Sequence, residues 1–392
     1  AWKVGDRISI APTGKNSEFE IRTILTIKRN VITFSEPLEF DHNRVFNRYT
    51  STYYTAEVLN LTRNVTIHGR GDGEASPLTN QRSHIHIMST SKSNISHIHI
   101  RHMGPRKLEQ QGTSKILGRY GLHFHRCGEV MRGSIIDGVV IEDCGSHSFV
   151  THATHGVTYR NCITYNTFNC AYWWDLPPDN GTSPINNTND ILYDNCVSAY
   201  TRSDPSNKGY RLASFMLGSG VGNSIRNCIA IGNQGNNGAA GYIWPESSNY
   251  TDNLWIFENN ICHNNKNNGI FTWQNDPHNH TINGFVAYTN GNNGIEHGAY
   301  TNAYKYNNIY LIDNLNGIFL HANPRPKGQP DEYGYILSFK NIKSTDPLYI
   351  TIHTLLGSGP TLFKDCSFPK VIVSELPSRG AFPIEIGRAS CR

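Results

Sequence analysis

The chain has 392 residues, enough to bury a large core in one or two domains. Only 17% of its residues are charged, the formal net charge is +4, and Lys and Arg form no long block, which excludes nucleic acid as the expected partner. No run of about 18 apolar residues occurs, so we expect no membrane-spanning helix. The abundance of Asn, Gly, Thr and Tyr favours strands and turns over helices.

Residues 1–70 contain short alternating segments such as EFEIR (18–22) and VITF (31–34). Alternation with a period of two predicts strands, and we expect an antiparallel β segment that leads into the rest of the chain. The sequence begins inside a strand-like stretch without an initiator Met, so we interpret it as a fragment. Residues 385–392 resemble the translated read-through of a sequencing adapter, and we set them aside.

One short phrase recurs along residues 71–384: an alternating apolar strand, then Asn or Asp, then a small or apolar residue, then a second strand. Examples are GVTYRNCITYN (156–166), NSIRNCIAIGN (223–233) and TLFKDCSF (361–368). Seven such units without an intervening helical pattern predict an all-β fold, a parallel β-helix in which each turn stacks on the next. A β-sandwich is the rival fold, because several Asn-Gly pairs are also typical of hairpin turns.

The cysteines follow the same phrase. Cysteines that come directly after Asn or Asp are expected to point inward and to stack as small apolar side chains, with free thiols favoured over disulfides: Cys144, Cys162, Cys196, Cys228 and Cys366. The preceding Asn or Asp would occupy a bend with a left-handed backbone. No CxxC pair occurs, so a zinc-finger-like site is excluded.

Histidines alternate with apolar residues in SHIHIM (83–88), SHIHIR (96–101) and LHFHR (122–126). A strand with this alternation presents its imidazoles on one face. The spacings from His99 to His123 and from His125 to His147 are close to one turn of a β-helix, so we expect a histidine ladder on one outer face. Three interpretations stay open: a solvated face, a metal site, or an acid/base centre. The candidate metal ligands are His123, His125, His152 and His155, with Asp175 one turn further on.

Aromatic residues lie near these histidines in the sequence. Trp173 and Trp174 in AYWWD, and Trp244 in GYIWPE, would stack on sugar rings if exposed and would cap the core if buried. With His147 and Arg119 they are the candidate substrate-binding residues, since arginine attracts carboxylates.

Several segments occur in the order and with the character of the β-helix region of the G8-domain proteins. They are WKVGDRISIAPT (2–13), AEVLNLTRNVTIHG (56–69), LGRYGLHFHRCG (117–128) and THATHGVTYRNCITYN (151–166). The chain resembles this family, which includes cell-surface hyaluronidases and fibrocystins, over about residues 1–250. One departure is Gly121, where the family has proline. The resemblance implies a right-handed, pectin-lyase-like parallel β-helix, a G8 domain upstream of residue 1, and an extracellular or cell-surface location.

The resemblance also implies hyaluronan depolymerisation, associated with calcium in the cell-surface member. We therefore expect an extracellular hydrolase of hyaluronan or another acidic polysaccharide, with His123, His125 and Asp175 as catalytic residues and calcium or zinc as the candidate metal. The alternative is a non-catalytic ectodomain that binds glycans or proteins, because fibrocystins share the scaffold without this activity. Neither interpretation includes nucleic acid or membrane contact by this fragment.

Overall fold

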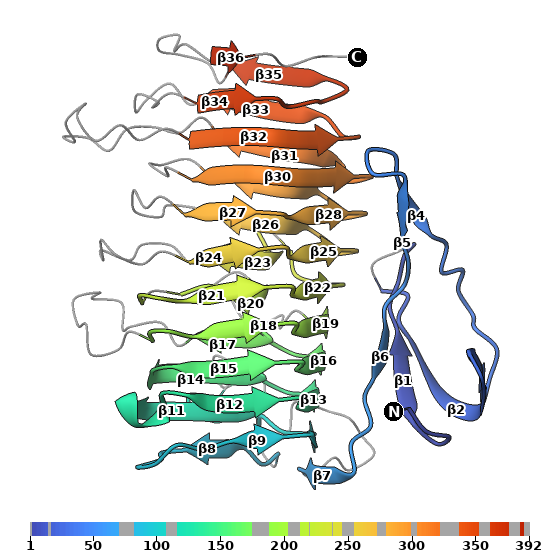
Figure 1. Cartoon of the computed structure of the whole chain (residues 1–392), viewed down its shortest axis with the longest axis vertical. Coiled ribbons are helices and arrows are strands. Elements are labelled where there is room, and N and C mark those ends of the chain that lie inside the picture. The colour runs from blue at the N-terminus through green and yellow to red at the C-terminus, as the bar shows by residue number, and fades with distance from the viewer. Residues whose placement is uncertain are drawn as a thin grey trace.

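Figure 1 shows the computed structural model of the chain, a tall stack of strands with an N-terminal segment along one side. The structure describes residues 2–14, 17–69, 82–106, 116–174, 188–202, 212–218, 220–236, 238–244, 255–272, 280–298, 304–321, 337–352, 361–375 and 385–387. Within these ranges the regular elements are strands, apart from one 3₁₀ turn, η2 (Glu129–Met131).

The N-terminal segment forms a small antiparallel sheet, as predicted. Its strand order is β3-β2-β1-β6, with β1 (Arg7–Ile10), β2 (Glu20–Lys28), β3 (Val31–Phe34) and β6 (Val58–Asn60). A separate hairpin joins β4 (Val45–Asn47) to β5 (Thr52–Tyr54).

The stack is a parallel β-helix built from two long sheets, which confirms the predicted fold and excludes the β-sandwich. The large sheet has 19 strands: β7 (Val65–His68), β9 (Ile95–Ser96), β10 (Ile98–Arg101), β12 (Ser134–Asp137), β13 (Val140–Cys144), β15 (Val157–Arg160), β16 (Ile163–Thr167), β18 (Leu192–Asp194), β19 (Val197–Thr201), β21 (Ser224–Arg226), β22 (Ile229–Ile231), β24 (Ile256–Glu258), β25 (Ile261–His263), β27 (Thr281–Asn283), β28 (Val286–Tyr288), β30 (Lys305–Ile312), β32 (Leu337–Ser344), β34 (Thr361–Lys364) and β36 (Glu385–Gly387).

The small sheet has 11 strands: β8 (Ile85–Ile87), β11 (Leu122–Gly128), β14 (Phe149–Thr154), β17 (Tyr172–Trp174), β20 (Ala213–Met216), β23 (Ala240–Trp244), β26 (Asn268–Thr272), β29 (Asn293–His297), β31 (Asn316–His321), β33 (Leu348–Ile352) and β35 (Val371–Glu375). The solenoid starts at β7, slightly before residue 71. It ends with β36, which pairs with β34 and lies within the terminal segment that we had set aside.

The recurring phrase is the corner between the two strands that each turn adds to the large sheet. Its Asn or Asp adopts a left-handed backbone, with φ of 53° at Asn161, 53° at Asn195 and 55° at Asn227. Asn tolerates this conformation at little cost, and the next residue then points inward. The eight described cysteines are buried and free, as predicted. The interior also stacks aromatic rings from turn to turn, with centroids 4.4 Å apart at Tyr172 and Phe215.

A second corner carries a ladder of buried polar side chains. Asn265 Nδ2 donates to Asn290 Oδ1 (2.8 Å), Asn290 Nδ2 donates to Asn314 Oδ1 (2.8 Å), and Asn314 Nδ2 donates to Asp346 Oδ2 (2.8 Å). The same oxygens accept backbone N–H groups, for example that of Asn290 at 3.1 Å. Each amide therefore satisfies groups that water cannot reach, and the ladder fixes the register of four turns.

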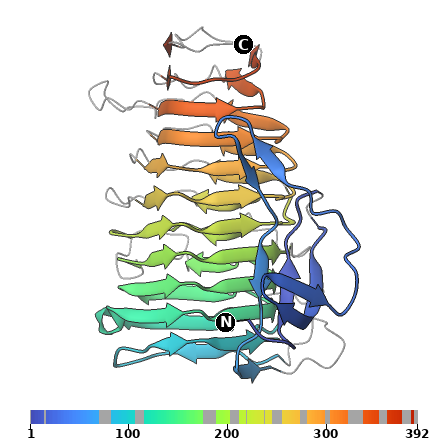
Figure 2. The ribbon, with the colours of Figure 1, turned by 45° about the vertical axis from the view of Figure 1, so that its right-hand side comes forward.

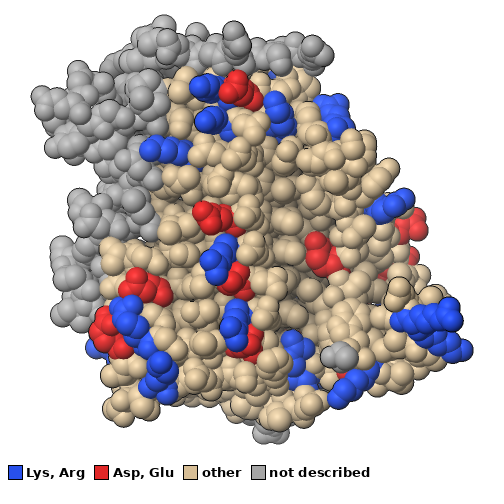
Figure 3. Space-filling view, in the orientation of Figure 1, with Lys and Arg blue, Asp and Glu red and all other residues tan. Residues whose placement is uncertain are grey.

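The outer face of the large sheet carries a column of charges. Register pairs Asp137 with Arg160, Arg160 with Asp194, and Asp194 with Arg226. Figure 3 shows red and blue side chains alternating on the lower part of this face and mostly blue ones near its upper end. There, register places the exposed Lys340 and Lys364 on neighbouring strands.

The N-terminal segment lies along the solenoid over many turns (Figures 1 and 2). Near its lower end, Arg7 and His99 both contact the buried carboxylate of Glu142. Burial opposes the charged form of Glu142, but the hydrogen bonds from His99 and Arg7 outweigh it and lower its pKa to about 2. Higher up, the rings of Tyr54 and Tyr288 stack with centroids 4.9 Å apart. The segment is therefore docked by both ionic and aromatic contacts.

We predict that Asn290→Ala lowers the free energy of unfolding by about 2–4 kcal/mol, since it strands buried partners on two neighbouring turns. Denaturant unfolding measures the loss. The matched control is Asn308→Gly, in an exposed amide ladder and at a left-handed φ of 55° that glycine tolerates, with a change of about 0.5 kcal/mol. Equal losses in both variants would contradict a special role for the buried ladder.

A second prediction concerns His297, which is fully buried and has Nδ1 2.9 Å from the Tyr306 hydroxyl. Burial lowers the pKa of His297 to about 3, below its ordinary value of 6.5. Between the folded and the unfolded pKa, His297 is protonated in the unfolded chain but not in the folded chain. Acidification through this range therefore lowers the free energy of unfolding. We expect the Tm of His297→Gln to fall less steeply than that of the wild type between about pH 7 and pH 4. Parallel Tm profiles would contradict this.

Candidate functional site

The predicted histidine face exists, on the outside of the small sheet at its N-terminal end. In β11, Leu122 and Phe124 point into the core, so His123 and His125 project outward. Register places His123 beside His86 of β8 on one side and Val150 of β14 on the other. His125 lies beside His152 of β14. Neighbouring strands are about 4.8 Å apart, so the parallel register alone brings these imidazoles into contact.

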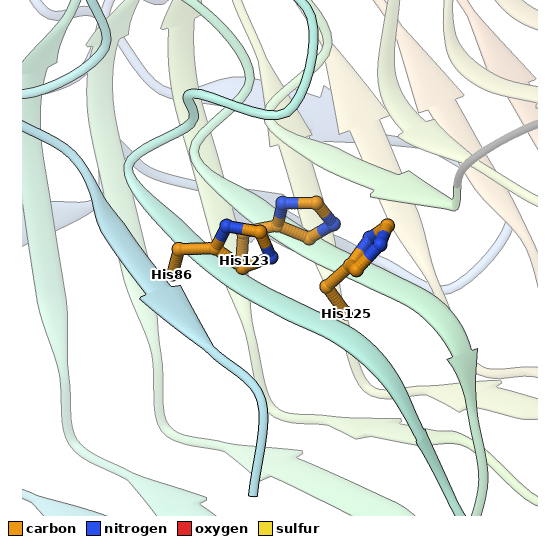
Figure 4. A group of neighbouring side chains, drawn as sticks. All are labelled: His86, His123 and His125. Atoms are coloured by element: carbon orange, nitrogen blue, oxygen red, sulfur yellow. The ribbon is translucent and has the colours of Figure 1, made fainter.

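Three of the rings form a nearly equal triangle, shown in Figure 4. Their centroids are 4.8 Å apart for His86 and His123, 4.9 Å for His86 and His125, and 5.0 Å for His123 and His125. One ring nitrogen from each lies within 4.8 Å of the others. His86 is exposed, His125 is half-buried and His123 is fully buried, so the triangle opens to solvent on one side.

The fully buried His123 is held in one tautomer. Its Nδ1 lies 2.9 Å from the carbonyl oxygen of Gly118, and because a carbonyl only accepts, Nδ1 carries the hydrogen. The Nε2 atom is then a bare lone pair. It is buried and has no hydrogen-bond partner among the described residues. A buried polar atom without a partner is costly in a folded protein and is typical of a binding site.

Burial lowers the pKa of His123 to about 3; the hydrogen bond to Gly118 opposes this shift, and the neighbouring His86, His125 and His152 contribute to it. His123 is therefore neutral at physiological pH. It offers an electron pair and is unsuited to act as a general acid there, which narrows the role predicted for it.

His125 and His152 form a hydrogen-bonded pair, with their Nδ1 atoms 3.1 Å apart. When both rings are neutral, one Nδ1 carries the shared proton and the other accepts it. The donor ring then has a bare Nε2, and the acceptor ring has an Nε2–H. The pair thus presents one proton acceptor and one proton donor.

Several sequence-based expectations about the histidines are wrong. His99 belongs to the large sheet and pairs in register with Val140, so it cannot stack on His123. His147 stacks instead on Trp173, with centroids 4.3 Å apart. His155 accepts a hydrogen bond from the backbone N–H of Asn189 (3.1 Å) and lies outside the triangle. These errors share a cause: the turns differ in length, so sequence spacing does not give the register.

His86 is the member that the sequence analysis missed as a ligand. Its signal was present, because SHIHIM alternates in the same way as LHFHR. The sequence alone did not indicate that the 37 positions from His86 to His123 make up one turn. The parallel pairing of β8 with β11 shows that they do.

The candidate substrate-binding residues are placed as follows. Trp173 and Trp244 are 2% and 3% exposed, so the expectation of exposed rings on a sugar-binding surface is wrong for both. Trp173 packs in a second apolar cluster outside the small sheet, and Trp244 packs in the main core. Arg119 is exposed in the segment just before β11. The Trp174 side chain and the whole of Asp175 lie outside the described residues.

At position 121, where the family resemblance leads us to expect proline, the backbone is used in a way that proline would not allow. The backbone N–H of Gly121 donates to the carbonyl of His147 (2.9 Å), a bond that proline cannot make. A Cβ atom would also lie 2.8 Å from the carbonyl oxygen of Ser148. Gly121 therefore lets β11 approach β14 closely, just before the strand that carries His123.

Comparison with known proteins agrees with this architecture. Residues 81–175, which contain the triangle, match a family model described as CEMIP beta-helix. None of the described segments is a helix long and apolar enough to cross a membrane.

Among related sequences, a G8 domain-containing protein of Dictyostelium discoideum is 28% identical over 176 residues, covering 44% of this chain and 14% of that protein. A cell surface hyaluronidase of Danio rerio is 27% identical over 192 residues, covering 44% of this chain and 13% of the hyaluronidase. The chain thus spans a small part of each relative.

A solved structure of an endo-xylogalacturonan hydrolase from Aspergillus tubingensis aligns with a TM-score of 0.37 and 9% identity, covering 84% of this chain and 91% of the hydrolase. The family match and the relatives agree with the motifs in β11 and β14, and they show that this part of the chain is similar to the β-helix region of the G8-domain proteins and cell surface hyaluronidases.

Proposed function

We propose that the chain is the glycan-depolymerising part of an extracellular or cell-surface protein, and that it hydrolyses hyaluronan or a similar acidic polysaccharide at the histidine triangle. One observation carries the proposal: the buried Nε2 of His123 has no described hydrogen-bond partner and lies in a triangle that opens to solvent through His86. The name of the Danio rerio relative supports the choice of substrate class.

The hydrogen-bonded pair of His125 and His152 supports a role for this site in the proton transfers that hydrolysis requires. Cleavage of a glycosidic bond by water needs one group that takes a proton from the water and one that gives a proton to the leaving oxygen. The His125–His152 pair offers a bare Nε2 and an Nε2–H, one for each task. The proton count then balances, because the pair ends with the number of protons with which it began. Asp175 remains a proposed catalytic carboxylate.

The charge pattern of the large sheet supports an acidic substrate. On the lower strands each Arg faces an Asp, for example Arg226 Nη2 and Asp194 Oδ2 at 2.9 Å. Lys340 and Lys364 break this alternation, since two like charges face each other on neighbouring strands. Like charges opposite one another destabilise a sheet unless an anion lies between them. A polysaccharide with regularly spaced carboxylates is such an anion.

We predict that the double variant His123→Ala/His125→Ala reduces the rate at which reducing ends are released from hyaluronan by about 100-fold or more. His155→Ala is the matched control, because His155 directly follows β14 and lies outside the triangle, and it should keep activity within about threefold. Each variant's Tm is compared with the wild type to confirm folding. Equal release by wild type and double variant, both at background, would sink the enzymatic proposal for this substrate.

Binding of hyaluronan without turnover would instead support a non-catalytic glycan-binding ectodomain. The observation that favours this second candidate is the pair Lys340 and Lys364, because it would bind an acidic glycan on the large sheet, whereas the histidine triangle lies on the small sheet.

We also predict that Lys340→Glu/Lys364→Glu weakens the affinity for hyaluronan by about tenfold at low ionic strength, with a smaller effect at high salt. The control Lys3→Glu/Lys28→Glu makes the same change in net charge on the exposed N-terminal segment and should leave the affinity unchanged. Affinity measured at two salt concentrations checks both. If the two double variants behave alike, the lysine pair has no special role.

A further inference from the structure

We infer that His86, His123 and His125 form a site that binds zinc, and that His152 orients His125 through the hydrogen bond between their Nδ1 atoms. The inference deepens the proposed function and rests on it for the ion's chemical role, but the binding itself is argued from geometry. Four features of the described residues carry it: the triangle, the fixed tautomer of His123, the His125–His152 hydrogen bond, and the donor atoms.

The triangle is close to the size that a shared ion requires. Zinc binds imidazole nitrogens at about 2.0–2.1 Å, so ligand nitrogens around one ion are about 3.3 Å apart. The three nitrogens lie within 4.8 Å of one another. The remaining difference is within reach of side-chain rotation, because His86 is exposed and His125 is half-buried. His123 is buried and held in place, so the side chains of His86 and His125 would rotate toward it to share the ion.

His123 has the environment of a preorganised ligand. A histidine that binds a metal through one nitrogen ordinarily donates the hydrogen of the other to a carbonyl or carboxylate, which sets its tautomer and orientation. Here the carbonyl of Gly118 receives the Nδ1 hydrogen at 2.9 Å. Gly118 lies in the segment immediately before β11, so the same chain that carries the ligand also orients it. The orphaned, buried Nε2 is then the atom left for the ion.

His152 does for His125 what Gly118 does for His123. If His125 donates its Nδ1 hydrogen across the 3.1 Å contact to His152, its Nε2 carries the lone pair that would bind the ion. The parallel pairing of β11 with β14 fixes this contact, because the two residues are register partners.

The donor atoms select the kind of metal. Imidazole suits zinc and its transition-metal neighbours, whereas calcium takes six to eight oxygen ligands. The group has three nitrogen donors and no carboxylate oxygen. The calcium that the family resemblance implies therefore does not fit the triangle. Held by these three imidazoles, a zinc ion would supply an activated water. This water would replace the proton-acceptor role proposed for the bare Nε2 of the His125–His152 pair, and the Nε2–H of His152 would keep the role of proton donor.

The test is metal binding by the whole chain, measured apart from activity. The chain is stripped with a chelator and dialysed against zinc, and bound zinc is counted by elemental analysis. We expect one zinc per chain, not displaced by excess calcium. Cobalt substitution should give the visible absorption of a four-coordinate ion with nitrogen ligands. His123→Ala should weaken zinc binding by roughly 100-fold, and His152→Ala by roughly tenfold through the orientation of His125.

Two controls keep the result interpretable. His155→Ala should bind zinc like the wild type, and His86→Ala, which alters an exposed side chain, tests the site without disturbing the core. Full zinc binding by His86→Ala, His123→Ala and His125→Ala would overturn the inference, as would a wild-type chain that binds no zinc. Zinc binding without glycan turnover would uphold the metal site and reject the proposed function, whereas glycan turnover by a chain that fails to bind added zinc would reject the metal site and uphold the proposed function.

Discussion

In-register stacking of parallel strands is the constraint on which the rest of the molecule depends. Within the recurring phrase a left-handed Asn or Asp forms the corner between two strands of the large sheet, and the buried amides of Asn265, Asn290 and Asn314 hold successive turns in register. A slip of one residue would strand these amides and turn the core residues outward. Because the register cannot slip, side chains at equivalent positions are fixed about 4.8 Å apart, which is how histidines 37 positions apart in the sequence come into contact.

Local chemistry in the sequence was sufficient to predict the corners. The recurring phrase consists of a strand, an Asn or Asp, a small residue and a second strand. It predicts both the residue with the left-handed backbone and the inward-pointing Cys, since each depends only on the backbone of a single turn. Register was not predictable in this way. The 24 positions from His99 to His123 suggested one turn, yet these residues lie in different sheets, whereas His125 and His152, 27 positions apart, are partners. A β-helix repeats in space, and insertions between strands hide that repeat in the sequence.

The burial of the tryptophans has a related cause. Alternation predicts which residues leave the core, but it does not say whether a further layer covers them. The outer face of the small sheet carries a second apolar cluster that includes Val150, Trp173 and Phe271. Side chains in this cluster point away from the solenoid axis and are nevertheless buried. The Trp173 ring, which was predicted to be exposed, is part of this second core. The sequence pattern therefore predicts which side chains point into the solenoid and which point out of it. It does not predict which of the outward-pointing side chains are exposed to solvent.

This second apolar cluster also explains the electrostatics of the histidine triangle. His123 sits at its edge, beside Tyr120 with ring centroids 4.9 Å apart and beside Val150 in register, so one side of the ring lies in a medium of low polarity. The opposite side faces His86, which is exposed. Burial keeps His123 neutral, because no described carboxylate joins the triangle to stabilise its protonated form. A buried imidazole that stays neutral keeps its Nε2 lone pair, and a divalent ion reaching the triangle past the exposed His86 is a partner that such a lone pair would bind.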